Sequence, residues 1–194
     1  MKVFDFDNTI YDGECCIDFF LFVFRKKRTF SKYIPLAGYT LLLYKLNKLP
    51  IAKVEEVADS LSHVLIKYKE ETSDLIQEFW KTHQNRLKKE MLDKIGEDDI
   101  IITASPGVLI DGIKEKLKTK NIICSDLDVN TGKLSFLCMA ENKVKAFKTL
   151  YPDTSIDEFY TDSMSDKPLM DISDNVFFVK GKNITQIKTK ERIR

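Results

Sequence analysis

A long helical stretch separates the first strand of this chain from all later strands, and this order limits the fold more than any other feature. Residues 2–7 read as a buried strand, whereas residues 14–92 carry a helical pattern with little β signal. From Asp99 onward, short β-branched runs alternate with helical ones. This order predicts an α/β core with a mostly parallel sheet flanked by helices, and an all-helical cap domain inserted after the first strand. We therefore expect residues 1–13 and 93–194 to form the core and residues 14–92 to form the cap.

The second half of the chain shows the alternation in detail. Turn signals at residues 104–107 and 130–133 separate the expected elements, and the second turn predicts a hairpin. From Lys180 the chain is basic, which indicates a tail or a short terminal element. The expected elements are a strand at 100–103, a helix at 107–119, strands at 121–129 and 134–138, a helix at 141–150, a strand at 159–161, a helix at 166–172 and a strand at 176–179.

Composition limits the partners and the compartment. Of 194 residues 43% are hydrophobic and the formal net charge is +1, so we expect a globular protein without attraction to nucleic acid. The 4 cysteines, at positions 15, 16, 124 and 138, have the spacing of neither a zinc site nor a redox pair. We expect them to be reduced core thiols of a cytoplasmic protein. Because the sequence begins directly with a strand, we also expect no signal peptide.

Two apolar runs, residues 17–24 and 33–44, raise the question of whether the chain spans a membrane. A membrane-spanning helix needs about 20 consecutive apolar residues. The runs are closed earlier, by the basic residues 25–28 and by Lys45. They therefore predict buried helices of the cap. A basic amphipathic surface that rests on a membrane is the alternative, which the irregular polar face of these runs disfavours.

Two aspartates stand at the end of the first strand. Because a strand alternates its side chains, we expect Asp5 and Asp7 on one face. Two carboxylates this close repel each other unless a cation lies between them or one takes a proton. Mg²⁺ prefers such oxygen ligands, and open α/β sheets bind ligands at the carboxyl ends of their strands. The pair therefore indicates a magnesium and phosphate site, although a solvated β-turn built on Asn8 has the same local pattern.

Further polar residues follow later strands or begin a later helix. Thr103 ends an apolar strand, Lys143 begins a helix, and Asp162 and Asp166 follow another strand. Together with the D-x-D-x-T run, these motifs resemble the haloacid dehalogenase superfamily of phosphohydrolases, most closely its phosphoserine-phosphatase-like branch with a helical cap. The resemblance covers residues 3 to about 180 and implies a Rossmann-like sheet.

The resemblance implies a role for each residue of the first two motifs. Asp5 would be the nucleophile that takes the phosphoryl group, and Asp7 the general acid/base that protonates the leaving oxygen. A carboxylate nucleophile splits a slow hydrolysis into two easier steps. The Thr103 hydroxyl and the next backbone N–H, that of Ala104, would hold phosphate oxygens. Ser105 is an alternative to Thr103, but it lies past the strand, so Thr103 is preferred.

The third motif of the family is a lysine near the start of a late helix. By resemblance, Lys143 would neutralise charge on Asp5 and on the phosphate. Lys145 and Lys148 belong to the same helix, but the family pattern N-K-x-x-x-L/F matches at Lys143. We therefore assign the role to Lys143.

The fourth motif, D-S-x-x-D-x-P-L, begins at Asp162 and implies Mg²⁺ as the cofactor. Asp162 would bind magnesium directly, and Asp166 would bind it through water or hold the shell together. With Asp5 and Asp7 they form the expected magnesium site. A solvated acidic turn is the local alternative.

Glu14 stands seven residues after Asp7, where phosphoserine enzymes of this branch have a glutamate that helps to recognise the substrate amino group. We therefore include Glu14 among the expected substrate-binding residues. The cap departs from the family pattern, because the sequence has no G-x-x-x-F segment with a following arginine for the substrate carboxylate. This departure argues against phosphoserine itself.

These residues predict a magnesium-dependent phosphatase that hydrolyses a small phosphomonoester through an aspartyl-phosphate on Asp5. The aromatic, basic insert suits a substrate with an apolar or cationic part, such as a phosphorylated amino alcohol or a lipid-derived phosphate. The alternatives are a phosphatase that acts on a lipid-derived phosphate at a membrane surface and a non-catalytic binding protein of the same fold. The intact motif residues argue against the binding protein, and membrane association is not favoured.

Overall fold

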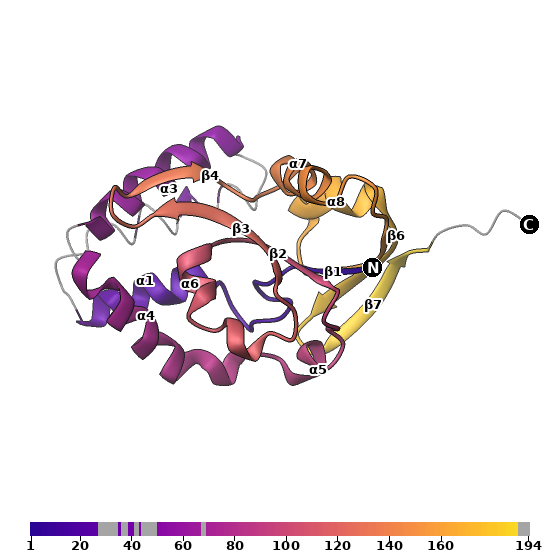
Figure 1. Cartoon of the computed structure of the whole chain (residues 1–194), viewed down its shortest axis with the longest axis horizontal. Coiled ribbons are helices and arrows are strands. Elements are labelled where there is room, and N and C mark those ends of the chain that lie inside the picture. The colour runs from indigo at the N-terminus through magenta and orange to yellow at the C-terminus, as the bar shows by residue number, and fades with distance from the viewer. Residues whose placement is uncertain (27–34, 36–38, 41–42, 44–49, 67–68, 190–194) are drawn as a thin grey trace, which may run out of the picture.

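The computed structural model describes residues 1–26, 35, 39–40, 43, 50–66 and 69–189. Within them, a 7-stranded sheet has the order β4-β3-β2-β1-β5-β6-β7 (Figure 1). The five inner strands run parallel, whereas β4 and β7 pair antiparallel at the two edges. The predicted mostly parallel α/β sheet is therefore confirmed. The strands are β1 (Lys2–Phe4), β2 (Ile100–Pro106), β3 (Asn121–Asp128), β4 (Lys133–Phe136), β5 (Ile156–Thr161), β6 (Ser173–Lys180) and β7 (Asn183–Lys188).

The helices divide into those inserted between β1 and β2 and those of the later chain. The insertion confirms the predicted helical segment after the first strand. Its helices are α1 (Cys15–Lys26), α3 (Ile51–Ile66), α4 (Lys69–His83) and α5 (Lys89–Leu92), with a 3-10 turn η2 (Gln84–Arg86). The later ones are α6 (Gly107–Asp111), α7 (Glu141–Leu150) and α8 (Lys167–Ile172), with 3-10 turns η3 (Lys114–Lys116) and η4 (Met164–Asp166).

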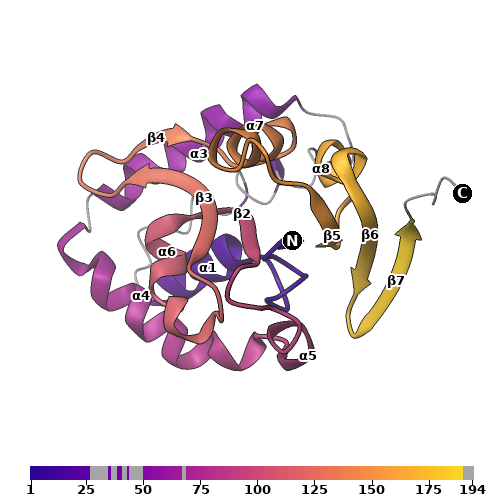
Figure 2. The ribbon, with the colours of Figure 1, turned by 45° about the vertical axis from the view of Figure 1, so that its right-hand side comes forward.

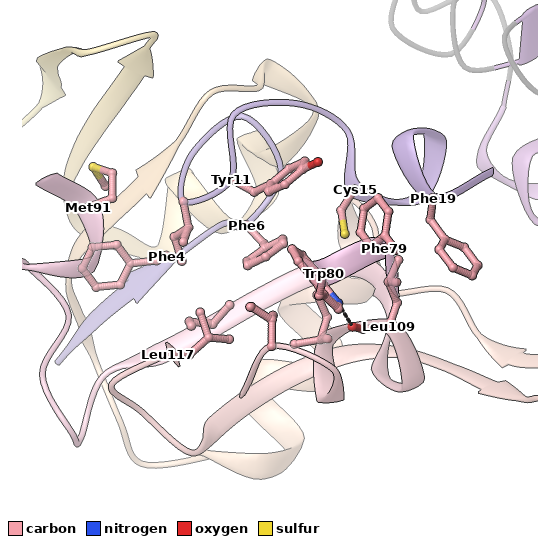
Figure 3. Close-up of a cluster of buried hydrophobic side chains, with 14 of the residues drawn as sticks. Phe4, Phe6, Tyr11, Cys15, Phe19, Phe79, Trp80, Met91, Leu109 and Leu117 are labelled. Carbon is pink, nitrogen blue, oxygen red and sulfur yellow. Dashed lines mark hydrogen bonds between the residues drawn. The ribbon is translucent and has the colours of Figure 1, made fainter. Parts of the chain in front are cut away.

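The sheet has a hydrophobic core on each face, because side chains alternate along a strand. Phe4 and Ile101 belong to the cluster that packs against α1, α4, α5 and α6 (Figure 3). Their neighbours Val3 and Ile100 belong to the cluster that packs against α7 and α8. All four side chains are fully buried. Burial of each such side chain contributes about 1.5–3 kcal/mol, so both faces of these strands favour a covering layer of helices.

Helix α4 packs directly on the first of these cores. The Trp80 indole Nε1 donates a hydrogen bond to the Leu109 carbonyl at 2.8 Å (Figure 3). A Cβ on Gly112 would lie 2.6 Å from Trp80 Cδ1, so the chain approaches Trp80 too closely there for a larger residue. The division into a core of residues 1–13 and 93–194 and a cap of residues 14–92 stays a prediction.

The β3–β4 hairpin lies alongside α3 (Figure 2). The Leu134 backbone N–H donates to Asp59 Oδ1 at 3.0 Å. The Ser62 hydroxyl donates to the Gly132 carbonyl. These bonds join the inserted helices to an edge of the sheet.

Two element boundaries differ from the sequence expectation for local reasons. The first strand ends at Phe4 instead of residue 7, because the backbone then turns. The N–H groups of Ile10 and Tyr11 both donate to the Phe6 carbonyl, and Asn8 has a φ of 54°. The helix expected at 107–119 ends at Asp111 and gives way to η3.

Other boundaries change as well. β2 extends to Pro106, so Ser105 lies within this strand and not past it, where the sequence pattern had placed it. β5 begins before residue 159 and β6 extends beyond 176–179 at both ends, whereas β4 ends before residue 138. The basic C-terminal segment includes a short terminal element, β7, which follows a turn at Gly181 with a φ of 61°.

The first apolar run forms α1, and its Phe19 and Val23 are buried in the core as predicted. Most of the second run, residues 33–44, lies outside the described residues. Among the helices that the structure describes, none has the length and apolar character to cross a membrane.

Candidate active site

The central strands bring the predicted site residues to one edge of the sheet. β1 lies between β2 and β5 and is parallel to both. Asp5 follows β1, Thr103 lies in β2, and Asp162 follows β5. Lys143 comes from the first turn of α7. Because the carboxyl ends of parallel strands meet at the same edge, residues from distant parts of the chain converge there.

Most of these residues line one cavity of about 60 Å³. It is lined by Asp5, Asp7, Glu14, Ala104, Met139, Lys143, Asp162, Ser163, Ser165 and Asp166. Thr103 is the predicted site residue that does not line this cavity. Sequence reasoning missed Met139, Ser163 and Ser165. The two serines belong to the fourth motif and could have been found there, whereas nothing in the sequence pattern distinguishes Met139.

A buried lysine joins two carboxylates in the cavity. Lys143 Nζ donates to Asp5 Oδ1 at 2.7 Å and lies 2.8 Å from Asp166 Oδ1. All three residues are buried. Burial alone would lower the pKa of Lys143, but Asp166 and Asp5 outweigh it and raise that pKa above its usual value. Lys143 is therefore a fixed cation beside Asp5.

The Asp5 carboxyl is in an environment that penalises its charge. Burial raises its pKa well above the usual range, Lys143 opposes the rise, and the nearby Asp166, Asp7 and Asp162 add to it. An additional cation in the cavity would favour the ionised form. The site is thus short of positive charge.

Asp7 has the properties of a proton donor. Its Oδ1 accepts a hydrogen bond from the Cys15 backbone N–H at 2.6 Å, and its Oδ2 accepts one from the Ser105 hydroxyl at 3.1 Å. Burial, followed by the charge of Glu14, raises the pKa of Asp7 to about 7. General acids and bases work best with a pKa near the operating pH. Asp7 can therefore give and take a proton near neutrality.

Thr103 and Ser105, the two candidates for the second motif, make different contacts. Thr103 is fully buried, and its Oγ1 accepts a hydrogen bond from the Ser105 backbone N–H at 3.0 Å. Ser105 is the one whose hydroxyl contacts Asp7. Ala104, between them, lines the cavity. Thr103 therefore supports the end of β2, where the strand register shifts, and Ser105 holds Asp7.

The Asp166 carboxylate is occupied by protein partners. Both of its oxygens lie within 2.9 Å of Lys143 Nζ, and Oδ2 also accepts a hydrogen bond from the Thr161 hydroxyl at 2.8 Å. Asp162 lines the same cavity and is less buried. Asp166 is thus placed to hold Lys143, whereas Asp162 faces the cavity.

The cavity holds several carboxylates, which are oxygen ligands of the kind that Mg²⁺ prefers. Among the described residues, no group of three or more His, Cys, Asp or Glu side chains could hold a metal ion. Mg²⁺ usually takes one or two carboxylates and completes its shell with water and substrate phosphate. Asp5, Asp7, Asp162 and Asp166 all line the cavity and are the aspartates that a bound Mg²⁺ would lie near.

Glu14 lies at the outer side of the site, directly before α1. Its Oε1 accepts a hydrogen bond from Asn8 Nδ2 at 2.9 Å. It lines the small cavity and also a larger one that lies toward the inserted helices. Glu14 thus lies where the two cavities meet.

The match to a protein family agrees with this geometry. Residues 3–171 match the sequence profile of the haloacid dehalogenase-like hydrolases. Because the match spans most of the chain, the protein belongs to that family. No match was found among curated proteins.

Solved structures of similar fold support the assignment of the architecture. A protein of unknown function from Bordetella pertussis Tohama I is 18% identical, with a TM-score of 0.74 over 91% of this chain and 87% of that one. A phosphoserine phosphohydrolase-like protein from Francisella tularensis subsp. tularensis SCHU S4 is 17% identical, with a TM-score of 0.61 over 91% and 86%. A phospho-aspartyl intermediate analogue of phosphoserine phosphatase is 16% identical, with a TM-score of 0.58 over 90% and 83%. At these identities the likeness is one of fold.

Proposed function

We propose that this protein is a magnesium-dependent phosphatase that hydrolyses a phosphomonoester through an aspartyl-phosphate on Asp5. The observation that carries the proposal is the buried contact of Asp5 with Lys143, in one cavity with Asp7. One carboxylate is held beside a fixed cation, and a second has a pKa of about 7. A nucleophile and a separate acid/base are what a two-step phosphoryl transfer needs.

In the first step, an oxygen of the Asp5 carboxylate attacks the phosphorus of the ester. The bond between phosphorus and the ester oxygen breaks as the new bond to Asp5 forms. Asp7, protonated at the start, gives its proton to the departing oxygen and releases the alcohol. Lys143 lies 2.7 Å from Asp5 and stabilises the charge around the phosphoryl group.

In the second step, Asp7 is ionised and takes a proton from a water molecule. The oxygen of that water attacks phosphorus, and the bond between phosphorus and Asp5 breaks. Inorganic phosphate leaves, and both carboxyl groups return to their starting states. The hydrogen bonds from Cys15 and Ser105 keep Asp7 in place through both steps.

Asp5 and Asp162, with Asp7 beside them, would hold Mg²⁺, which supplies positive charge next to the phosphate oxygens when bound. The raised pKa of Asp5 supports a bound cation, because Lys143 only partly offsets the effects of burial and of the neighbouring carboxylates. Asp166 acts as a positioning residue for Lys143. The backbone N–H of Ala104, at the cavity wall, would hold a phosphate oxygen, and Thr103 orders the end of β2 that presents it.

The 4 cysteines are all free, and Cys15 and Cys138 are buried. This supports a reducing compartment, and we propose the cytoplasm.

The test is the substitution Asp5→Asn with p-nitrophenyl phosphate as substrate, with Mg²⁺ and with EDTA. The amide keeps the shape of the side chain but is a poor nucleophile, so phosphate release should fall by more than about 1000-fold. The control is Asp12→Asn, because Asp12 is exposed and does not line the cavity. A folded Asp5→Asn protein that keeps a tenth of the activity contradicts the proposal. Phosphate binding without turnover in the unsubstituted protein indicates a binding protein.

A further inference from the structure

An apolar chamber of about 200 Å³ adjoins the small cavity that holds the site. Asp7, Glu14, Ala104 and Met139 line both spaces. The two spaces therefore meet at these four residues. Its other lining residues are mostly aliphatic or aromatic.

The walls of the chamber come from the inserted helices and from the β3–β4 hairpin. Ile17 and Phe20 of α1 and Val57 of α3 form one side, and Leu127 and Leu134 of the hairpin form another. The hydrogen bonds between α3 and the hairpin hold these two sides together. The chamber is thus enclosed jointly by the inserted helices and by the β3–β4 hairpin of the sheet.

The charges around the chamber disfavour an anionic leaving group. Of the described residues that line it, the charged ones are Asp7 and Glu14, and no Lys or Arg is among them. Among the described lining residues, a substrate with a carboxylate beside its ester would meet two acidic groups and no cation. Transfer of such a charge into apolar surroundings is unfavourable without a partner.

Asp7 fixes the direction in which the alcohol part of a substrate would lie. The proton donor to the leaving oxygen has to contact that oxygen. Because Asp7 lines both spaces, the leaving oxygen would lie at their boundary, with phosphorus on the side of Asp5. The carbon chain attached to that oxygen then enters the apolar chamber.

We infer that the substrate is a phosphate monoester of an apolar, lipid-like alcohol, with its phosphate against Asp5 and Lys143 and its carbon chain in the chamber. This inference rests on the proposed phosphatase function. Burial of apolar surface in the chamber provides the specificity. Each methylene that enters should raise affinity about fourfold, which corresponds to about 0.8 kcal/mol.

The test uses n-alkylphosphonates, whose carbon–phosphorus bond is not hydrolysed, at monomeric concentration and with Mg²⁺. Calorimetric titration compares methylphosphonate with n-butylphosphonate. Three added methylenes should tighten binding about 60-fold. The matching phosphate esters should show the same trend in kcat/KM.

Two substitutions on α3 distinguish an effect on the chamber from a general effect on the helix that forms its wall. Ala58 lines the chamber and is half-buried, whereas Ala52 is exposed and does not line it. Ala58→Phe should reduce the ratio of butyl to methyl affinity toward one, and Ala52→Phe should leave the ratio unchanged. If Ala58→Phe does not fold, Val57→Asn makes the wall polar with little change in volume and should also reduce the ratio.

The outcomes distinguish the inference from the proposed function. Equal affinities for the two phosphonates overturn the inference, even if phosphate esters are hydrolysed. An unchanged ratio in folded Ala58→Phe and Val57→Asn also overturns it. A third outcome is that affinity rises with the length of the alkyl chain and loses this dependence in the variants, but the protein releases no phosphate from any ester. This outcome supports the chamber and refutes the phosphatase function.

Discussion

Replacing Lys143 by Met removes a cation but keeps an unbranched side chain, and it leaves two buried carboxylates without their partner. Lys143 Nζ lies 2.7 Å from Asp5 Oδ1 and 2.8 Å from Asp166 Oδ1. The exposed fractions of Lys143, Asp5 and Asp166 are 3%, 5% and 3%. Removing one member of a buried ion pair costs about 3–5 kcal/mol. We therefore expect the free energy of unfolding of metal-free Lys143→Met to fall by about 3–5 kcal/mol at pH 8.

The loss should become smaller as the pH falls. Burial raises the pKa of Asp5 and Lys143 opposes that rise, so the substitution should raise this pKa further. A carboxyl whose pKa is raised in the folded state binds a proton more tightly there than in the unfolded chain. Stability is therefore lost as the pH rises through the folded pKa and is recovered below it. At pH 5 we expect about half of the loss, or less, because protonation removes the uncompensated charge.

Urea unfolding with EDTA at pH 5 and pH 8 measures the effect. The control is Lys145→Met on the same helix, because Lys145 is exposed. Its free energy of unfolding should change by about 0.5 kcal/mol or less. An undiminished stability of Lys143→Met at pH 8, or an equal loss at the two pH values, would refute the view that Lys143 compensates buried carboxylate charge.

Three further predictions concern the metal, the acid and the core. Mg²⁺ should activate phosphate release and Ca²⁺ should inhibit it, because Ca²⁺ takes more and longer oxygen contacts and can occupy both oxygens of Asp5; equal rates with the two ions would contradict this. Glu14→Gln removes a charge that, after burial, helps to raise the pKa of Asp7 to about 7. The alkaline limb of the kcat/KM profile should therefore move to lower pH, and an unmoved limb would argue against Asp7 as the acid. Gly112→Ala would place a Cβ 2.6 Å from Trp80 Cδ1, and overpacking should lower the free energy of unfolding by about 1–3 kcal/mol in a urea titration.

The sheet could be predicted from local patterns because its strands are buried on both faces. The apolar run at 100–102 has no polar alternation, which is typical of an inner parallel strand covered by helices on both sides. The helical pattern of the insert is also local. Element ends were harder to predict, because they depend on contacts with distant residues. The helix expected at 107–119 ends just before Gly112, where the chain passes close to Trp80.

The acidic site residues could be predicted because their positions at strand ends are visible in the sequence. Their interactions were not visible. Asp5 and Lys143 are 138 residues apart in the chain, and only the packing of α7 against the sheet brings them together. The sequence pattern left open whether Asp166 binds magnesium through water or holds the shell together. The structure places both oxygens of Asp166 against Lys143.

By itself, the sequence determined most of the strands and helices and which residue types stand where strands end. It determined this because period and turn chemistry act over a few neighbouring residues. Only the tertiary structure decided that Ser105 holds Asp7, and that α3 and the hairpin enclose an apolar chamber beside it. An apolar side chain that lines a chamber and one that fills a core have the same sequence pattern, because hydrophobic periodicity reports burial and not the surface against which a residue is buried.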